Sequence, residues 1–117
     1  MNRDDIMAYI AETFYTDPEY PWARTPRYAV FRHSHNKKWF AAIVDVTEDK
    51  LGLNGKKRVE ALLLKCDPLL IGSLRNGRDI LPGYHMNKEH WITVVLGGSL
   101  PAAQIQSLID FSHELTK

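Results

Sequence analysis

Three stretches rich in β-branched, aromatic and aliphatic residues follow one another between residues 27 and 65, with short turn-forming segments between them. The first two, RYAVFRH and KKWFAAIVDV, flank the turn-forming SHN and predict a hairpin. A connection with two glycines, one in an Asn-Gly pair, leads into RVEALLLK as a third strand. Because connections this short favour neighbouring antiparallel strands, the middle of the chain predicts an antiparallel sheet.

A helix is expected before these strands. Asn2 is a good helix cap, and Ile6, Ile10 and Phe14 recur every four residues, which predicts one apolar stripe. Three prolines in TDPEYPWARTP disfavour a longer helix.

The second half of the chain predicts a short helix, two extended segments and a final helix. Asp67 and Pro68 suit the start of a helix over PLLIGSL. ILPGY is expected to be extended, and HWITVVL is typical of a strand. Pro101 is expected to start the last helix, whose predicted inner stripe consists of Ile105, Leu108, Ile109 and Leu115.

These elements predict an α+β fold, a two-layer α/β sandwich with the order α-β-β-β-α-β-β-α. Amphipathic helices need an apolar surface to cover, so we expect them on one face of the antiparallel sheet and the opposite face partly open. The 117 residues suit a single domain, 1–117, without repeats or linkers.

Charge and composition indicate where in the cell the protein is expected to be found. No apolar run approaches the roughly 20 residues that span a bilayer, the first residues do not resemble a secretory signal, and one cysteine, Cys66, cannot form an internal disulfide. We therefore expect a cytoplasmic protein, with a monomer favoured. The net charge is only +1, but residues 24–88 carry thirteen basic and six acidic side chains, whereas both ends are acidic.

The sequence gives little support for catalysis or for a metal site. His85 and His90 are five residues apart, a spacing that brings them together on neither a strand nor a helix. Cys66 has no partner histidine at a recognisable spacing, and GLNGKK lacks the spacing of a phosphate-binding loop. We expect no enzyme activity, no cofactor and no metal.

Basic residues interleaved with aromatics are the strongest functional signal. They lie over the first hairpin, at the next connection and in PGYHMNKEHW, where cations could meet phosphates and exposed rings could stack on bases. The alternative is that the aromatics fill the core and the lysines keep the strands in solution.

Several stretches resemble the YjbR/MmcQ family of small bacterial proteins. The strongest likeness is PGYHMNKEHWITVVLGGSLP followed by IQSLIDFSHELTK, and supporting pieces are YPWARTPRYAVFRH, KKWFAAIVDV and LLLKCDPLL. The resemblance covers nearly the whole chain and implies an α-β3-α-β2-α fold, a double-wing, frataxin-like arrangement and DNA binding. It brings no catalytic residues.

The combined prediction is a non-enzymatic cytosolic protein that binds DNA through a basic, aromatic-bearing face of the sheet. The expected contacts are Arg27, Arg32, Lys37, Lys38, Trp39, Lys57, Arg58, His85, Asn87, Lys88 and Trp91. Two alternatives stay open. One is a protein- or peptide-interaction module that uses the open face or an edge strand. The other is cation binding by the acidic first helix through Asp4, Asp5, Glu12, Asp17 and Glu19.

Overall fold

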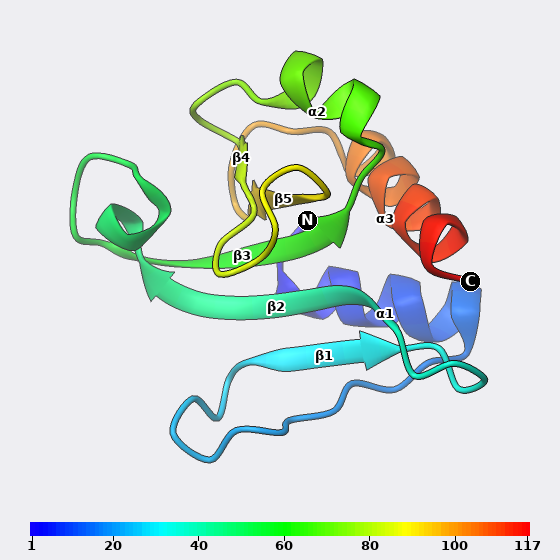
Figure 1. The fold of residues 1–117 in the computed structure, drawn as a ribbon. Coiled ribbons are helices and arrows are strands. Elements are labelled where there is room, and N and C mark those ends of the chain that lie inside the picture. The colour runs from blue at the N-terminus through cyan, green and yellow to red at the C-terminus, as the bar shows by residue number, and fades with distance from the viewer.

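The computed structural model describes residues 1–117 and has three α-helices, one 3-10 helix and five strands. In chain order the elements are α1 (Arg3–Phe14), β1 (Ala29–Arg32), β2 (Trp39–Thr47), η1 (Glu48–Leu51), β3 (Arg58–Lys65), α2 (Pro68–Leu74), β4 (Ile80–Pro82), β5 (Trp91–Val95) and α3 (Ala102–Thr116). The predicted α+β order α-β-β-β-α-β-β-α is confirmed (Figure 1).

The five strands form one antiparallel sheet in the order β1-β2-β3-β5-β4. The chain leaves β3 through α2, forms the edge strand β4 and returns as β5 between β3 and β4. The β1–β2 pairing shifts between Phe31 and Arg32, whose partners are Ala41 and Trp39. Phe40 is therefore the extra residue of a β-bulge, which lets its ring join Ala41 in the helix-side core.

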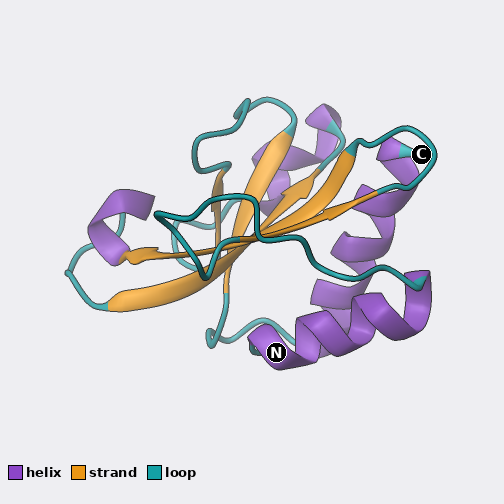
Figure 2. Ribbon diagram, turned by 90° about the horizontal axis from the view of Figure 1, so that it is seen from below, coloured by secondary structure: helices purple, strands orange, loops and turns teal.

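Helices α1 and α3 lie on one side of the sheet (Figure 2). A cluster of 17 buried residues fills the space between the two layers. The helices contribute Ile6 and Ile10 from α1 and Ile105 and Ile109 from α3. This is the predicted two-layer packing, and we call this side the helix-covered face.

The helix starts were predicted from their caps, and the structure confirms two of them. The Asn2 side chain accepts a hydrogen bond from the Asp5 amide at 2.9 Å, and the Asp5 carboxylate accepts one from the Asn2 amide. Asp67 accepts from the Leu69 amide at 2.9 Å, with Pro68 at the first helical position of α2.

The predicted inner stripe of the last helix is partly wrong. Leu115 is 45% exposed, whereas Ser112 and Thr116 are buried beside Ile105 and Ile109. Ser112 can occupy a buried position because its hydroxyl donates to the Phe40 carbonyl of β2 and accepts from the Lys65 amide of β3. In the last two turns of α3, hydrogen-bonded hydroxyl side chains thus occupy the buried positions, and Leu115 does not.

The end of α3 is fastened to the turn between β1 and β2. The Nε2 atom of His33 lies 2.8 Å from the Thr116 hydroxyl and 3.1 Å from the His113 carbonyl. The His113 ring stacks on Phe14 of α1 with ring centroids 3.9 Å apart. Burial lowers the pKa of both His33 and His113, which favours their neutral forms.

The opposite side of the sheet, which we call the uncovered face, is covered by neither α1 nor α3 but is not bare. Eight buried residues lie on it, including Val30, Ala42 and Leu63. Two loop segments reach over them: residues 15–28 and the β4–β5 link, which crosses in front of β3 in Figure 1. The face is open only in places, so any site on it is bounded by loop side chains.

Residues 15–28 also continue the sheet at its β1 edge. Glu19 and Val30 exchange two backbone hydrogen bonds, at 2.9 and 2.8 Å. The other edge is β4, which has three residues and ends in Pro82. Among the helices of this fold, none combines the length and apolar character needed to cross a membrane.

Candidate functional site

A pocket of about 330 Å³ opens on the uncovered face. Its floor comes from β2 and β3, and aromatic side chains of the two overlying loops supply its walls. The lining residues are Trp22, Thr25, Tyr28, Trp39, Ala42, Ile43, Val44, Leu63, Tyr84, His85 and Met86. We call this hollow the aromatic pocket.

The aromatic pocket exists because a small residue lies at the centre of the sheet. Ala42 pairs with Val30 on one side and Leu63 on the other, and its methyl group leaves the space above it empty. Trp22 stands edge-on to Trp39 with centroids 5.7 Å apart, and edge-on to Tyr28 at 6.2 Å. These edge-to-face contacts stabilise the wall of the aromatic pocket and leave its interior open.

Three lysines gather next to the aromatic pocket. A second hollow, of about 420 Å³, is lined by Lys37, Lys38, Trp39, Lys65, Met86, Trp91 and Thr116. It shares Trp39 and Met86 with the aromatic pocket. We call it the lysine–tryptophan patch, and it brings together four of the residues predicted to contact DNA: Lys37, Lys38, Trp39 and Trp91.

Lys65 belongs to this patch and was not among the predicted contacts. Its position on this face can be inferred from the sequence, because side chains alternate between the two faces along a strand. Leu63 and Lys65 lie two residues apart on β3 and face the same side, whereas Leu62 and Leu64 face the helices. RVEALLLK was predicted as a strand without its two faces being assigned, so Lys65 was not included among the contacts.

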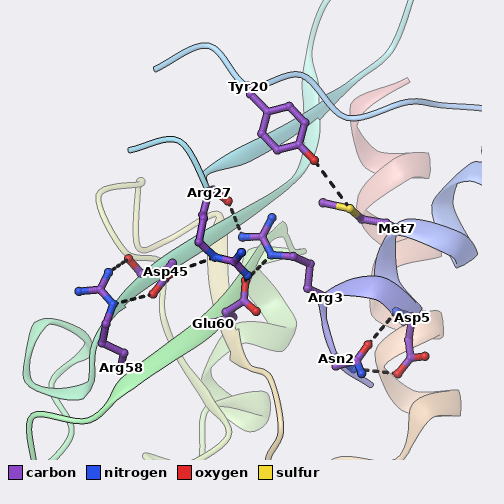
Figure 3. Close-up of polar contacts among 9 residues, drawn as sticks. All are labelled: Asn2, Arg3, Asp5, Met7, Tyr20, Arg27, Asp45, Arg58 and Glu60. Atoms are coloured by element: carbon purple, nitrogen blue, oxygen red, sulfur yellow. Dashed lines mark hydrogen bonds and ion pairs between the residues drawn. The ribbon is translucent and has the colours of Figure 1, made fainter. Parts of the chain in front are cut away.

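Two of the predicted arginine contacts take part in an ion-pair network (Figure 3). Arg27 lies 3.1 Å from Asp45 and 3.1 Å from Glu60, and Arg58 lies 3.0 Å from Asp45. Arg3 of α1 also pairs with Glu60 and donates to the Arg27 carbonyl. Hydrogen bonding to Glu60 raises the pKa of the Arg27 guanidinium, and the two carboxylates offset much of the positive charge here.

Arg32 and Lys57 lie outside the lysine–tryptophan patch. Arg32 makes a two-point ion pair with Glu19, with one nitrogen–oxygen distance of 2.9 Å. Glu19 was also a candidate ligand for cation binding by the acidic first helix, but here its carboxylate is occupied by an arginine. Lys57 precedes β3, at the opposite end of that strand from Lys65.

The β4–β5 link, which contains His85, Asn87 and Lys88, is held mainly by its own hydrogen bonds. Asn87 accepts the Glu89 amide at its side chain, at 2.8 Å, and its carbonyl accepts two further amides. Lys88, one of the predicted contacts, donates from Nζ to the Gly83 carbonyl at 2.9 Å, so one of its three donors is used within the link. Gly83 is needed there, since an added Cβ would lie 2.7 Å from the Cβ of Trp91.

His85 is the one polar residue of this link that lines the aromatic pocket. Its backbone is left-handed, with φ 57°, a conformation that histidine adopts more readily than most residues. The ring lies against Tyr84 with centroids 4.1 Å apart. This turn presents the imidazole to the pocket.

Cys66 and the side chains that could ligate a metal are the remaining reactive groups. Cys66 is buried, and burial together with the Asp67 charge raises the pKa of its thiol, which disfavours the nucleophilic thiolate. No three histidine, cysteine, aspartate or glutamate side chains come together in a way that could hold a metal ion.

The comparisons with known proteins agree with the sequence resemblance. The YjbR family model matches residues 13–115. The chain is 48% identical over 117 residues to the uncharacterized protein YyaQ of Bacillus subtilis (strain 168), covering 100% of this chain and 99% of that protein. It is 47% identical over 55 residues to the uncharacterized protein YjbR of Escherichia coli (strain K12), which covers 46% of this chain and 47% of that protein.

Solved structures share the fold along the whole chain. A crystal structure of a Pseudomonas syringae protein has 51% sequence identity and a TM-score of 0.97, with 100% of both chains covered. A Deinococcus radiodurans protein has 27% identity and a TM-score of 0.73, covering 97% of this chain and 77% of that one. With a family match over most of its residues and a relative aligned from end to end, this chain belongs to the YjbR family.

Proposed function

We propose that this chain is a non-enzymatic cytosolic protein that binds single-stranded DNA, as a monomer, through the lysine–tryptophan patch. The supporting observation is the grouping of three lysines around two half-buried tryptophans beside a hollow lined by aromatic rings. Lysine ammonium groups bind phosphates, and partly exposed indole rings stack on bases. Both kinds of contact are available within one patch.

A single strand fits this surface better than a duplex. Stacking on Trp39 or Trp91 requires a base whose flat face is free, and pairing and stacking hide those faces in a duplex. The two long helices, α1 and α3, also lie on the other face of the sheet, so neither is presented to a major groove from this side (Figure 2). The neutralised arginines at Asp45 and Glu60 leave few cations for a long phosphate track.

Titration with single-stranded and duplex oligonucleotides at several salt concentrations tests this proposal. The three tryptophans of the chain all line the aromatic pocket or the lysine–tryptophan patch, so quenching of their fluorescence reports binding. Three phosphate contacts predict a slope of log K against log salt of about −2. The single strand is expected to bind more tightly than the duplex.

Two variants that lose the same charge test whether DNA binds at this patch or is attracted by the overall positive charge of the protein. Replacing Lys37, Lys38 and Lys65 by glutamine is expected to remove most of the salt-dependent affinity. Replacing Lys50, Lys56 and Lys57, on and after η1, removes the same charge at the far end of β3 and is expected to leave binding nearly unchanged. Equal losses from the two triple variants would contradict the proposed surface.

Absence of binding to either form of DNA at low salt would reject the proposal. The apolar lining of the aromatic pocket would then favour the other candidate ligand, a segment of another protein. The edges of the sheet favour that candidate less, because Glu19 already pairs with β1 and β4 has only three residues.

A further inference from the structure

We infer that the aromatic pocket receives one unpaired nucleobase of the bound strand, an inference that rests on the proposed DNA binding and specifies how the strand is held. The lysine–tryptophan patch offers stacking and charge at the surface. The pocket beside it is a recess with a different composition, and the following features favour a base as its occupant.

The size and walls of the pocket suit a flat ring system. Its volume of about 330 Å³ is at the lower end of the range of about 300–1,000 Å³ typical of small-molecule sites. Nine of its eleven lining residues are hydrophobic, and Trp22, Tyr28, Trp39 and Tyr84 supply aromatic surface. A flipped or unpaired base is commonly held between aromatic and apolar side chains in such a pocket.

Polar groups at the pocket could read the edge of a base. Thr25 and His85 line the pocket from different loops, and the imidazole of His85 is not used in a hydrogen bond within the chain. A few polar groups in an otherwise apolar site fix the orientation of a ligand. The left-handed backbone of His85 keeps its ring at this place.

Positive charge lies on two sides of the pocket, as a strand passing through it requires. The lysine–tryptophan patch shares Trp39 and Met86 with the pocket. On the other side a hollow of about 250 Å³ shares Thr25 and Tyr28 with it; there Arg27 and Arg58 are paired with Asp45, and Arg24 is the cation that makes no ion pair. A base in the pocket therefore places its neighbouring phosphates near cations, a complementarity that an uncharged aromatic ligand would not use.

Oligonucleotides that differ by one base test this inference. One is a short strand of abasic sites, and the other carries a single thymine at its centre, so the number of phosphates is the same. The strand with thymine is expected to bind about 5- to 140-fold more tightly, the range for stacking of one base on aromatic side chains. Equal affinities would overturn the inference and leave the proposed function standing, whereas no binding of either strand or of normal DNA would reject both.

Filling the pocket should remove the preference for the strand with thymine. Ala42→Leu adds a side chain to the pocket floor without changing a charge, so affinity for the abasic strand is expected to stay the same. Ala103→Leu makes the same change on an exposed position of α3 and is expected to keep the preference. If Ala42→Leu keeps the preference, the base does not enter this pocket.

A change in the wall of the pocket and a peptide ligand complete the test. Trp22→Ala removes a wall from an exposed loop residue, so it tests the same point if Ala42→Leu does not fold. It is expected to reduce the preference at least 5-fold by loss of stacking surface, about the effect of one base. An acidic peptide with one tryptophan that binds when the thymine strand does not would overturn the inference in favour of a protein ligand.

Discussion

The helix-covered and uncovered faces of the sheet are built from the same strands, yet they differ in how completely they are closed. On the helix-covered face, 17 buried residues from the sheet and the helices form one core, and the Ser112 hydroxyl of α3 satisfies backbone groups of two strands. On the uncovered face, eight buried residues lie beneath loops that leave the aromatic pocket. Alternation along a strand thus places neighbouring residues in the helix-packed core on one side and beneath the loops and the aromatic pocket on the other.

Leu62 and Leu63 of β3 provide the most direct test of this difference. Both are nearly inaccessible, but Leu62 faces the helices and Leu63 faces the aromatic pocket. We expect Leu62→Ala to lower the free energy of unfolding by about 4 kcal/mol and Leu63→Ala by about 2 kcal/mol, because a deletion next to an open hollow creates less new enclosed cavity. Urea denaturation measures both, and equal losses would show that the two faces are packed alike.

Removing the Ser112 hydroxyl tests the polar part of the helix-covered face. Ser112→Ala leaves the Phe40 carbonyl and the Lys65 amide without their side-chain partner. We expect a loss of about 2 kcal/mol in the free energy of unfolding. Ser107→Ala, on an exposed position of the same helix, serves as the control and should change stability by less than about 0.5 kcal/mol. A neutral Ser112→Ala would mean that water replaces the hydroxyl.

Acidification should weaken the helix-covered face by a smaller amount. Burial lowers the pKa of His33 and His113, so the unfolded chain binds protons at a higher pH than the folded one. Their contribution is complete above their usual pKa of about 6.5 and is lost as the pH falls below it.

The groups around these two histidines differ in sign. His35, Lys38 and Lys117 act against protonation of His33, while Glu114 and Asp110 partly favour that of His113. We expect the Tm to fall between pH 7.5 and pH 5.5, and His113→Phe, which keeps an aromatic ring against Phe14, to reduce that fall. A Tm that does not change over this interval contradicts the expectation.

The smallest effect on stability is expected at the wall of the aromatic pocket. Trp22 is 41% exposed and contacts Tyr28 and Trp39 through ring edges. Trp22→Ala should lower the free energy of unfolding by about 1 kcal/mol, the scale of an aromatic pair at a partly exposed site. A loss as large as that of Leu62→Ala, measured in the same urea titration, would mean that this wall belongs to the core.

Much of the fold could be predicted because its signals are local. Residues 58–65 are β3 as expected, and Asp67 with Pro68 begins α2 where predicted, since a strand-forming run and a helix cap depend on few neighbours. Leu115 was assigned to the core wrongly because its position was judged from hydrophobicity alone. The hydrogen bonds that make Ser112 acceptable inside the protein come from strands more than forty residues away.

The candidate site was less predictable because it depends on contacts between distant segments. Lys37, Lys38, Trp39 and Trp91 meet in one patch, but Lys65 joins them only through the register of β3 against its neighbours. Arg27 and Arg58 form ion pairs with carboxylates on β2 and β3, those of Asp45 and Glu60, and lie outside the patch. The hollow above Ala42 depends on the small side chain and on the two loops that pass over it. The sequence pattern does not show that these loops lie above this residue.

The pairing of Glu19 with Val30 has a consequence for how molecules of this protein meet one another. An exposed strand edge is a template on which further chains can add, and such growth leads to aggregates. Here one rim is occupied by the protein's own loop, and the opposite rim is a three-residue strand that ends in a proline. The sheet therefore has no long free edge on which further strands could add, and a binding partner is expected to contact one of its faces.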